Sequence, residues 1–127
     1  MTRPFEGIKV IDITHVLAGP FAAYQLALLG ADVIKVEDPG DPDQSRGTGA
    51  DRALNRTHMG TGFLTQASNK RAITLNLKTK QGRDILKKLV ATADVLVENY
   101  RPGAFEALGL GYEEMRKLNP KLIYASG

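Results

Sequence analysis

The sequence has no cysteine, no apolar run long enough to cross a bilayer, and no signal-peptide pattern in its opening residues, MTRPFEG. Without cysteine the chain forms no disulfide and offers no thiolate as a nucleophile or metal ligand. This composition is compatible with a reducing compartment. We therefore expect a cytoplasmic protein with no membrane-embedded part.

The chain also has no large excess of positive or negative charge. The formal net charge is +3 over 127 residues, and the basic residues are spread along the chain among acidic ones. Proteins that bind nucleic acid usually carry a basic stripe or patch, so we expect no nucleic-acid partner here. The 43% apolar and 24% charged content is typical of a globular domain, and the length allows one domain with its own core.

Three common ligand-binding motifs are missing as well. The loop after the first predicted strand reads THVLAGP instead of GxGxxG, there is no GxxxxGK[ST], and His, Asp and Glu show no metal-ligand spacing. Glu37 lies eighteen positions after Gly19, close to where dinucleotide-binding folds place a ribose-binding acid. Without the glycine fingerprint this spacing is a weak signal, and we expect neither an NAD site nor a metal site.

The clearest pattern that is present is a strand, a loop and a helix near the N-terminus. Residues 8–13 are rich in β-branched apolar side chains, which is typical of a strand buried on both faces of a parallel sheet. The predicted helix has Pro20 at its first position, Leu29 at its end and Gly30 as the capping residue. A second strand at 32–37 completes a βαβ unit. The loop before the helix fits either an anion-binding site or a plain connection.

From residue 38 to 60 the chain is rich in Gly, Asp, Arg and Thr and shows no sustained periodicity. So long an irregular loop is uncommon in a compact domain, and it indicates either a functional cover or a segment ordered by other partners. The remaining predicted elements are a short helix at 61–68, a half-exposed strand at 72–77 near the sheet edge, a helix at 80–91 capped by Thr79, a buried strand at 95–97, helices at 104–108 and 112–118, and a fifth strand at 122–126. Strands alternating with helices predict an α/β fold, with a mainly parallel sheet covered by helices on both faces.

In such sheets ligands bind beyond the carboxyl ends of the strands, near a switch in strand order. The loops at those ends supply His15, Lys78, Asn99, Tyr100 and Arg101. Two cations, other donors and an aromatic ring suit a phosphorylated ligand that contains an aromatic group. Each residue also has a simpler explanation: the two cations as solvated surface charges, the histidine as one satisfied by neighbouring backbone, and the tyrosine as a packing residue.

Four motifs, LAGP, GADVIKVE, NKR and VENYRPG, occur together in this sequence. Their combination closely resembles the N-terminal part of the family III (CaiB/BaiF) coenzyme A transferases, which include formyl-CoA transferase, carnitine-type CoA transferases and α-methylacyl-CoA racemase. The resemblance covers essentially the whole chain except the middle of the 38–60 segment. It implies a Rossmann-like, three-layer CoA-binding domain at residues 1–127, a second, smaller domain outside this chain, and a homodimer of two interlocked chains.

The resemblance further implies that coenzyme A binds along the strand-end loops as a substrate, in free or acylated form, with no tightly bound cofactor. The family's CoA contacts fall on ten residues of this sequence: His15, Val16, Ala18, Leu75, Asn76, Leu77, Lys78, Asn99, Tyr100 and Arg101. Formyl-CoA transferases typically carry Gln where this chain has Leu17, and Arg where it has Asp38 and Ala107. The first difference argues against formyl or oxalyl specificity. The other two remove cations that could meet the nucleotide phosphates.

In the family's transferases an aspartate attacks the acyl-CoA thioester, giving a mixed anhydride and then an aspartyl-CoA thioester, from which a carboxylic acid acceptor takes the CoA. The racemase branch uses a His/Asp pair for proton transfer at the α-carbon. Both sets of residues follow the stretch aligned with residues 122–127, so the resemblance implies no catalytic residue in this chain. The sequence is therefore interpreted as the CoA-binding part of an acyl-CoA:carboxylate CoA-transferase. The alternatives are the racemase branch and a stand-alone nucleotide-binding module without catalysis.

Overall fold

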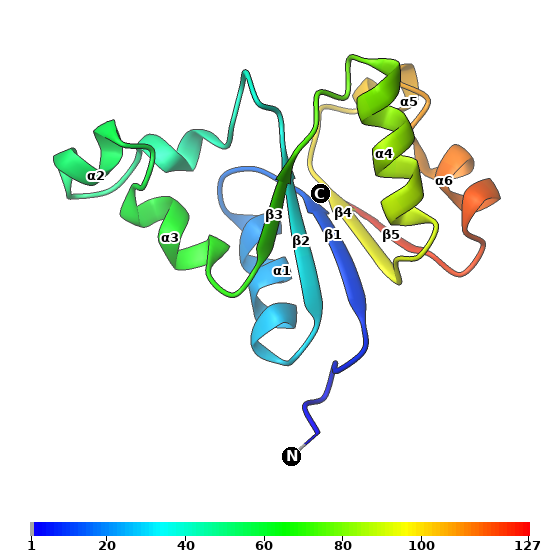
Figure 1. Ribbon diagram of the computed structural model, residues 1–127, viewed down its shortest axis with the longest axis horizontal. Coiled ribbons are helices and arrows are strands. Elements are labelled where there is room, and N and C mark those ends of the chain that lie inside the picture. Colours follow the sequence, from blue (N-terminus) through cyan, green and yellow to red (C-terminus); the bar gives the residue numbers. More distant parts are fainter. Residues whose placement is uncertain (1) are drawn as a thin grey trace.

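The computed structural model describes residues 2–127, which form a five-stranded parallel sheet between two layers of helices (Figure 1). In chain order the elements are β1 (Lys9–Ile13), α1 (Ala18–Leu28), β2 (Asp32–Glu37), η1 (Gln44–Gly47), α2 (Arg52–Arg56), α3 (Thr61–Ala67), β3 (Arg71–Thr74), α4 (Lys80–Val90), β4 (Val95–Glu98), α5 (Ala104–Ala107), α6 (Tyr112–Leu118) and β5 (Ile123–Ser126). The predicted α/β fold is confirmed. Within the described range no helix combines the length and apolar composition needed to cross a membrane.

The strands lie in the order β3-β2-β1-β4-β5, with β1 at the centre. Ile11 of β1 pairs with Ile34 of β2 on one side and with Leu96 of β4 on the other. From β1 the chain moves outward to β2 and β3, and then returns to the opposite side of β1 for β4 and β5. The direction of winding therefore reverses between β1 and β4, which is where open α/β sheets form a crevice at the carboxyl ends of their strands.

One face of the sheet is covered by α4, α5 and α6, and its core is apolar. Ile11, Ile13 and Leu96 of the strands form one cluster with Leu86 and Val90 of α4, and each is at most 1% exposed. These helical residues recur at a spacing of four, so one stripe of α4 faces the sheet. We call this side of the sheet the α4 face.

The opposite side, the α1 face, is covered by α1 and has a smaller apolar cluster. Val10 and Val33 pack against Ala23 and Ala27 of α1, and all four are buried. The small alanine side chains let the helix lie close to the strands. Because neighbouring residues of a strand point to opposite faces, Val10 and Ile11 serve different layers.

The α1 face is less well covered over β4 and β5. Val95 pairs with Ile123 and Val97 with Ala125, and the two valines are only half-buried at the edge of the α1-side cluster. Ile123 is 64% exposed. Helix α1 contacts β4 but leaves the apolar residues on this face of β4 and β5 partly exposed.

The prediction of an irregular segment from 38 to 60 is wrong in part. The segment contains η1 and α2, which are too short for an apolar periodicity to develop. Each begins at a capping aspartate. The Asp43 carboxylate accepts from the backbone N–H of Ser45, and the Asp51 carboxylate accepts from two N–H groups in the first turn of α2. Side-chain caps, and not a hydrophobic stripe, define these two turns.

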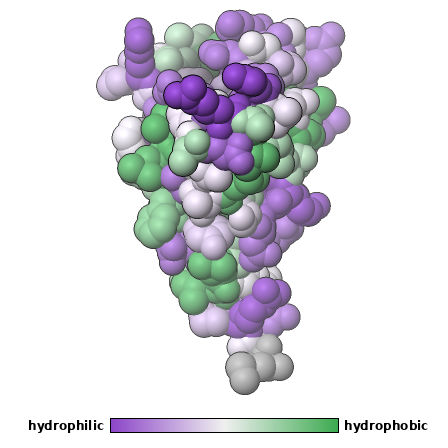
Figure 2. Space-filling model, turned by 90° about the vertical axis from the view of Figure 1, so that its left-hand side faces the viewer, coloured by the Kyte–Doolittle hydropathy of each residue, from purple (hydrophilic) through white to green (hydrophobic). Residues whose placement is uncertain are grey.

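Helix α3 ties this segment to the rest of the domain. Phe63 of α3 is 8% exposed, and the Arg46 guanidinium lies 3.8 Å from the centre of its ring. The helix also contacts η1 and α1. Seen from the side of α2 and α3, the surface has apolar areas interrupted by hydrophilic ones (Figure 2).

Two element boundaries in the structure differ from the predicted ones. Helix α1 begins at Ala18, so Pro20 is its third residue and not its first. The missing N–H of proline is tolerated there because the first-turn N–H groups have no partner within the helix. Strand β3 ends at Thr74 instead of residue 77, although the N–H of Leu75 still donates to the Glu37 carbonyl at 2.9 Å.

Two predicted helix signals are confirmed. Gly30 follows the end of α1 with φ of +109°, a conformation that favours glycine. Thr79 caps α4, because its hydroxyl accepts a hydrogen bond from the N–H of Gly82 at 3.1 Å.

Candidate functional site

The candidate site lies where the carboxyl ends of β1 and β4 meet. The loop that follows β1 contains His15 and leads into α1, and the loop that follows β4 contains Asn99, Tyr100 and Arg101 and leads into α5. The two strands are neighbours in the sheet, and the direction of winding reverses between them. The predicted ligand edge therefore contains the switch in strand order, beside which open α/β sheets bind their ligands.

Three of the predicted residues contact one another there. The backbone N–H of His15 donates to Asn99 Oδ1, and Asn99 Nδ2 donates back to the His15 carbonyl, both at 2.9 Å. His15 Nε2 lies 3.4 Å from the Tyr100 hydroxyl, and the two rings meet edge to face with centres 5.5 Å apart. Tyr100 also packs on Phe105, with ring centres 4.8 Å apart. The packing explanation for Tyr100 is thus observed, and its ring is fixed beside His15.

Burial, together with the negative charges of Asp38, Asp41 and Glu98, raises the pKa of the Tyr100 phenol. The hydroxyl is consequently neutral at physiological pH. A neutral phenol can both donate and accept a hydrogen bond. It can therefore hydrogen-bond either to the histidine or to a ligand at this edge of the sheet.

Val16 and Ala18 occupy the turn from β1 into α1. Val16 has φ of +74°, a conformation that is unusual for a β-branched residue, and its side chain is 43% exposed. Ala18 is exposed and begins α1, whose N-cap residue, Leu17, makes no side-chain cap. Uncapped first-turn N–H groups are available for an anionic ligand.

The other predicted residues spread along the same edge of the sheet. Arg101 is exposed after β4 and forms no ion pair within residues 2–127. Residues 75–78 follow β3, two strands from β1. The side chains of Leu75 and Leu77 are buried in the core, so only their backbone can face a ligand. Asn76 accepts from the N–H of Lys78 at 2.9 Å, and both of these side chains are exposed.

A hollow that the sequence did not indicate lies beside the turn into α1. Its volume is about 340 Å³. It is lined by Val16, Leu17, Gln44, Ser45, Thr48, Gly62 and Gln66. Four of these seven residues belong to η1 and α3, and only the tertiary fold brings them to the loop. Gln66, with its amide nitrogen turned to the loop, donates to the carbonyls of Val16 and Leu17 at 2.9 and 3.1 Å.

Two buried ion pairs support this region and were also missed. Lys35 Nζ lies 3.1 Å from Asp43, with side chains 2% and 1% exposed. Lys70 Nζ lies 2.8 Å from Asp12, with side chains 1% and 0% exposed. The position of Lys35 within the apolar run of a predicted strand was a signal that could have found the first pair, because buried lysines are almost always paired.

Glu37 has a structural partner. Arg46 donates to its two carboxylate oxygens, from Nη2 at 2.6 Å and from Nε at 2.9 Å. Burial alone would raise the pKa of Glu37, but the hydrogen bonds from Arg46 and from the Asp43 N–H outweigh it and hold this pKa below its ordinary value. The bidentate pair explains the acid at the end of β2 without a ribose.

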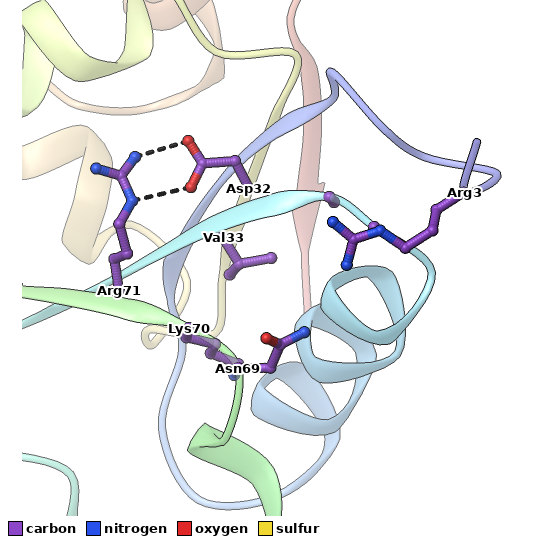
Figure 3. A pocket seen from close by; sticks show the side chains of 8 residues that line it. Arg3, Asp32, Val33, Asn69, Lys70 and Arg71 are labelled. Atoms are coloured by element: carbon purple, nitrogen blue, oxygen red, sulfur yellow. Dashed lines mark hydrogen bonds and ion pairs between the residues drawn. The ribbon is translucent and has the colours of Figure 1, made fainter. Parts of the chain in front are cut away.

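Another hollow lies at the opposite edge of the sheet, at the amino ends of β2 and β3. Its volume is about 410 Å³, and Arg3, Asp32, Asn69 and Arg71 contribute to its lining (Figure 3). Arg71 donates to both oxygens of Asp32, at 2.9 and 2.6 Å. Since parallel strands present their carboxyl ends at the other edge, this hollow is separate from the candidate site. No group of three or more His, Asp or Glu within residues 2–127 is placed to hold a metal ion.

Residues 5–127 match the family model described as CoA-transferase family III. The chain is 46% identical over 124 residues to a human protein named succinyl-CoA:glutarate CoA-transferase, covering 98% of this chain and 28% of that protein. It is 47% identical over 126 residues to an Acetobacter aceti protein named acetyl-CoA:oxalate CoA-transferase, covering 97% of this chain and 31% of that protein.

A solved structure of a CAIB/BAIF family protein from Brucella suis superposes with a TM-score of 0.89 at 38% identity, over 99% of this chain and 33% of that one. The chain thus spans about a third of the length of the relatives it matches. The family match covers nearly all of the described residues, and both the sequence and the fold agree with it. The chain belongs to CoA-transferase family III, a family of enzymes.

Proposed function

We propose that this chain is the coenzyme A-binding part of an acyl-CoA:carboxylate CoA-transferase. The observation that carries the proposal is the junction of the β1 and β4 loops at the switch in strand order, where His15 and Asn99 join the loops by two hydrogen bonds of 2.9 Å. The names of the similar proteins pair an acyl-CoA with a carboxylate, which supports the same substrate classes for the whole protein.

The groups along this edge suit the parts of coenzyme A. Arg101 and Lys78 are exposed cations for the phosphates. The uncapped start of α1 near Val16 and Ala18 offers further N–H donors. The hollow of about 340 Å³ beside Leu17 has the size of a small-ligand pocket and suits the acyl end of the thioester.

The covalent step is proposed to use an aspartate outside residues 1–127. Its carboxylate would attack the thioester carbon and release CoA thiolate, leaving a mixed anhydride. The thiolate would then attack the aspartyl carbonyl, releasing the first carboxylate and forming the aspartyl-CoA thioester, from which the acceptor acid takes the CoA by the reverse steps. Several aspartates of this chain are already in ion pairs, including Asp12, Asp32, Asp43 and Asp84. Their pairing supports a nucleophile elsewhere.

Two further proposals concern the whole protein. We propose that it has a second, smaller domain outside residues 1–127 and that it acts as a homodimer. Sedimentation of the complete protein tests the dimer, and a single monomeric species would contradict it.

Calorimetric titration of the chain with CoA and with NAD tests the ligand. We expect CoA to bind more tightly, because the loop after β1 lacks the glycine fingerprint of dinucleotide-binding folds. Tighter binding of NAD would contradict the proposal.

Arg101→Ala provides the residue-level test. We expect CoA binding to weaken by about 1.5–3 kcal/mol, the scale of a hydrogen bond to a charged group. Arg101→Lys should recover part of the loss, since lysine cannot bind bidentately. The matched control is Lys121→Ala, which removes an exposed cation before β5 at the other edge of the sheet. If Arg101→Ala and Lys121→Ala change CoA affinity equally, Arg101 is a solvated surface charge and does not contact the ligand.

A further inference from the structure

The loop between β1 and α1 is held by side chains. Each of the six backbone N–H and C=O groups from Thr14 to Val16 has a side-chain hydrogen-bond partner at 2.8 to 3.1 Å. In chain order the partners are Asp12, Lys35, Asn99 twice, Asp43 and Gln66. A loop without regular secondary structure is thereby given one defined backbone conformation.

Val16 is the residue in this loop that most needs support. Its φ of +74° brings the β-carbon of an L-residue into close contact with its own backbone, and the branched side chain makes this worse. Such a conformation persists only where the surroundings fix it. The Val16 N–H donates to Asp43 Oδ1 at 3.1 Å, and its carbonyl accepts from Gln66.

Asp43 lies 27 residues further along the chain and is nearly inaccessible to solvent, at 1% exposure. Its Oδ1 also accepts from the N–H and the hydroxyl of Ser45, at 3.0 and 2.7 Å, and its Oδ2 accepts from Lys35 Nζ at 3.1 Å. The same Lys35 ammonium donates to the Thr14 carbonyl at 2.8 Å. The buried Lys35–Asp43 pair therefore holds the loop by hydrogen bonds at two residues, Thr14 and Val16.

Burial alone would raise the pKa of Asp43. The hydrogen bonds from Ser45 and the charge of Lys35 outweigh that effect and keep the pKa below its ordinary value. The carboxylate is therefore ionised at neutral pH, as an acceptor for three N–H or O–H groups and an ammonium must be.

We propose that Asp43, charge-balanced by Lys35, is a positioning residue for the coenzyme A site. It holds Val16 in its left-handed conformation and so fixes the backbone on which His15 and Ala18 meet the ligand. The proposal deepens the proposed function and rests on it for the identity of the ligand. It also gives the segment from 38 to 60 a role, since the capping turn of η1 carries the anchoring carboxylate.

The test compares Asp43→Asn with a matched control, Asn119→Ala, in the chain as it stands. Asn119 donates to the carbonyls of Val90 and Ala93 at 2.9 and 2.8 Å, and it lies at the amino ends of β4 and β5, away from the site. Both substitutions disturb several hydrogen bonds, but only the first removes the negative charge next to Val16. Hydrogen exchange of the Val16 amide and CoA titration are measured on each variant.

For Asp43→Asn we expect exchange of the Val16 amide to accelerate about tenfold or more and CoA affinity to fall about tenfold or more, the scale of a hydrogen bond to a charged group. The control should change both by less than about twofold, in keeping with a distant site. Ser45→Ala serves if Asp43→Asn does not fold. It removes only a hydroxyl that orients Asp43, and it should shift both readouts in the same direction by less.

Unchanged Val16 exchange relative to the control would overturn the inference, and so would faster exchange with unchanged CoA affinity. If the unsubstituted chain binds no CoA, the proposed function fails. In that case the exchange measurement still decides separately whether Asp43 holds Val16.

Discussion

The two faces of the central sheet are built from alternating residues of the same strands, yet they differ in chemistry. On the α4 face, β1 and β2 present Ile11, Ile13, Ile34 and Val36, all apolar and buried. On the α1 face the same strands begin with Val10 and Val33 and then change to charged residues. Those charged residues are Asp12, Lys35 and Glu37, each at most 4% exposed.

The two faces therefore have different roles: the apolar face mainly stabilises the fold, and the charged half of the other face supports the candidate site. The apolar face excludes water over the whole length of the strands and supplies the hydrophobic part of the folding free energy. The α1 face is apolar only at the amino half, and its charged carboxyl half lies beneath the loop that leads into α1. Buried ion pairs are a weak source of stability compared with apolar packing of the same volume, but breaking one is costly. Their value here is geometric, because they direct side chains to the backbone of the β1–α1 loop.

The largest expected effect comes from breaking a pair on the charged half. Lys70→Met leaves the Asp12 carboxylate buried without its ammonium, and we expect a loss of about 3–5 kcal/mol in the free energy of unfolding. Urea unfolding measures it. The double variant Asp12→Asn with Lys70→Met should recover much of the loss. A single variant as stable as the parent would show that the pair carries no structural role.

A cavity on the apolar face should cost somewhat less. Leu86 is fully buried against the sheet, and Leu86→Ala should reduce the free energy of unfolding by about 2–5 kcal/mol. Its neighbour Ile85 is 41% exposed on the same helix, so Ile85→Ala is the matched control and should cost less than half as much. Equal losses for the two variants in urea unfolding would contradict the assignment of the α4 stripe.

Acid should weaken the charged half selectively. Asp43 and Glu37 have pKa values below their ordinary values of 3.8 and 4.5, since hydrogen bonds and nearby cations outweigh burial. A carboxylate with a lowered folded pKa stabilises the native state fully above its ordinary pKa, and this contribution is lost as pH falls through the folded value. Stability measured in urea at a series of pH values should therefore drop below about pH 4.5. A variant in which Asp43→Asn is combined with Lys35→Met should show a shallower drop, and an identical slope would count against the assignment.

The smallest effect is expected at the amino edge. The Arg71–Asp32 pair has good bidentate geometry but its side chains are 66% and 45% exposed, so water and salt screen it. Asp32→Asn should leave urea unfolding nearly unchanged. A loss comparable to that of Lys70→Met would mean that exposure does not separate the two kinds of ion pair in this protein.

Most elements could be predicted from the sequence because their signals are local. The β-branched run of β1, the α4 stripe, Gly30 after α1 and the Thr79 cap each depend on residues within one element. The segment from 38 to 60 resisted prediction because η1 and α2 are stabilised by single capping aspartates and by Phe63 beneath Arg46. Such contacts leave no periodicity.

The candidate site could likewise be predicted only in part. The strand-end rule and the family resemblance led to His15, Asn99 and Tyr100, and the structure brings these three into contact. The ligand contacts themselves stay predictions. The hollow beside Leu17 and the left-handed Val16 had no signal in the sequence, because each depends on side chains from η1 and α3.

The sequence by itself determined the class of fold, the succession of most strands and helices along the chain, and membership of the transferase family, because alternation, caps and motifs are properties of short stretches. Only the tertiary structure decided which group each buried charged side chain contacts. Lys70 and Asp12 are 58 residues apart in the chain, and Val16 and Asp43 are 27 apart. Their pairing depends on how β2, β3 and η1 pack around β1, and the cost of burying a charge without a partner then leaves one arrangement of the loop.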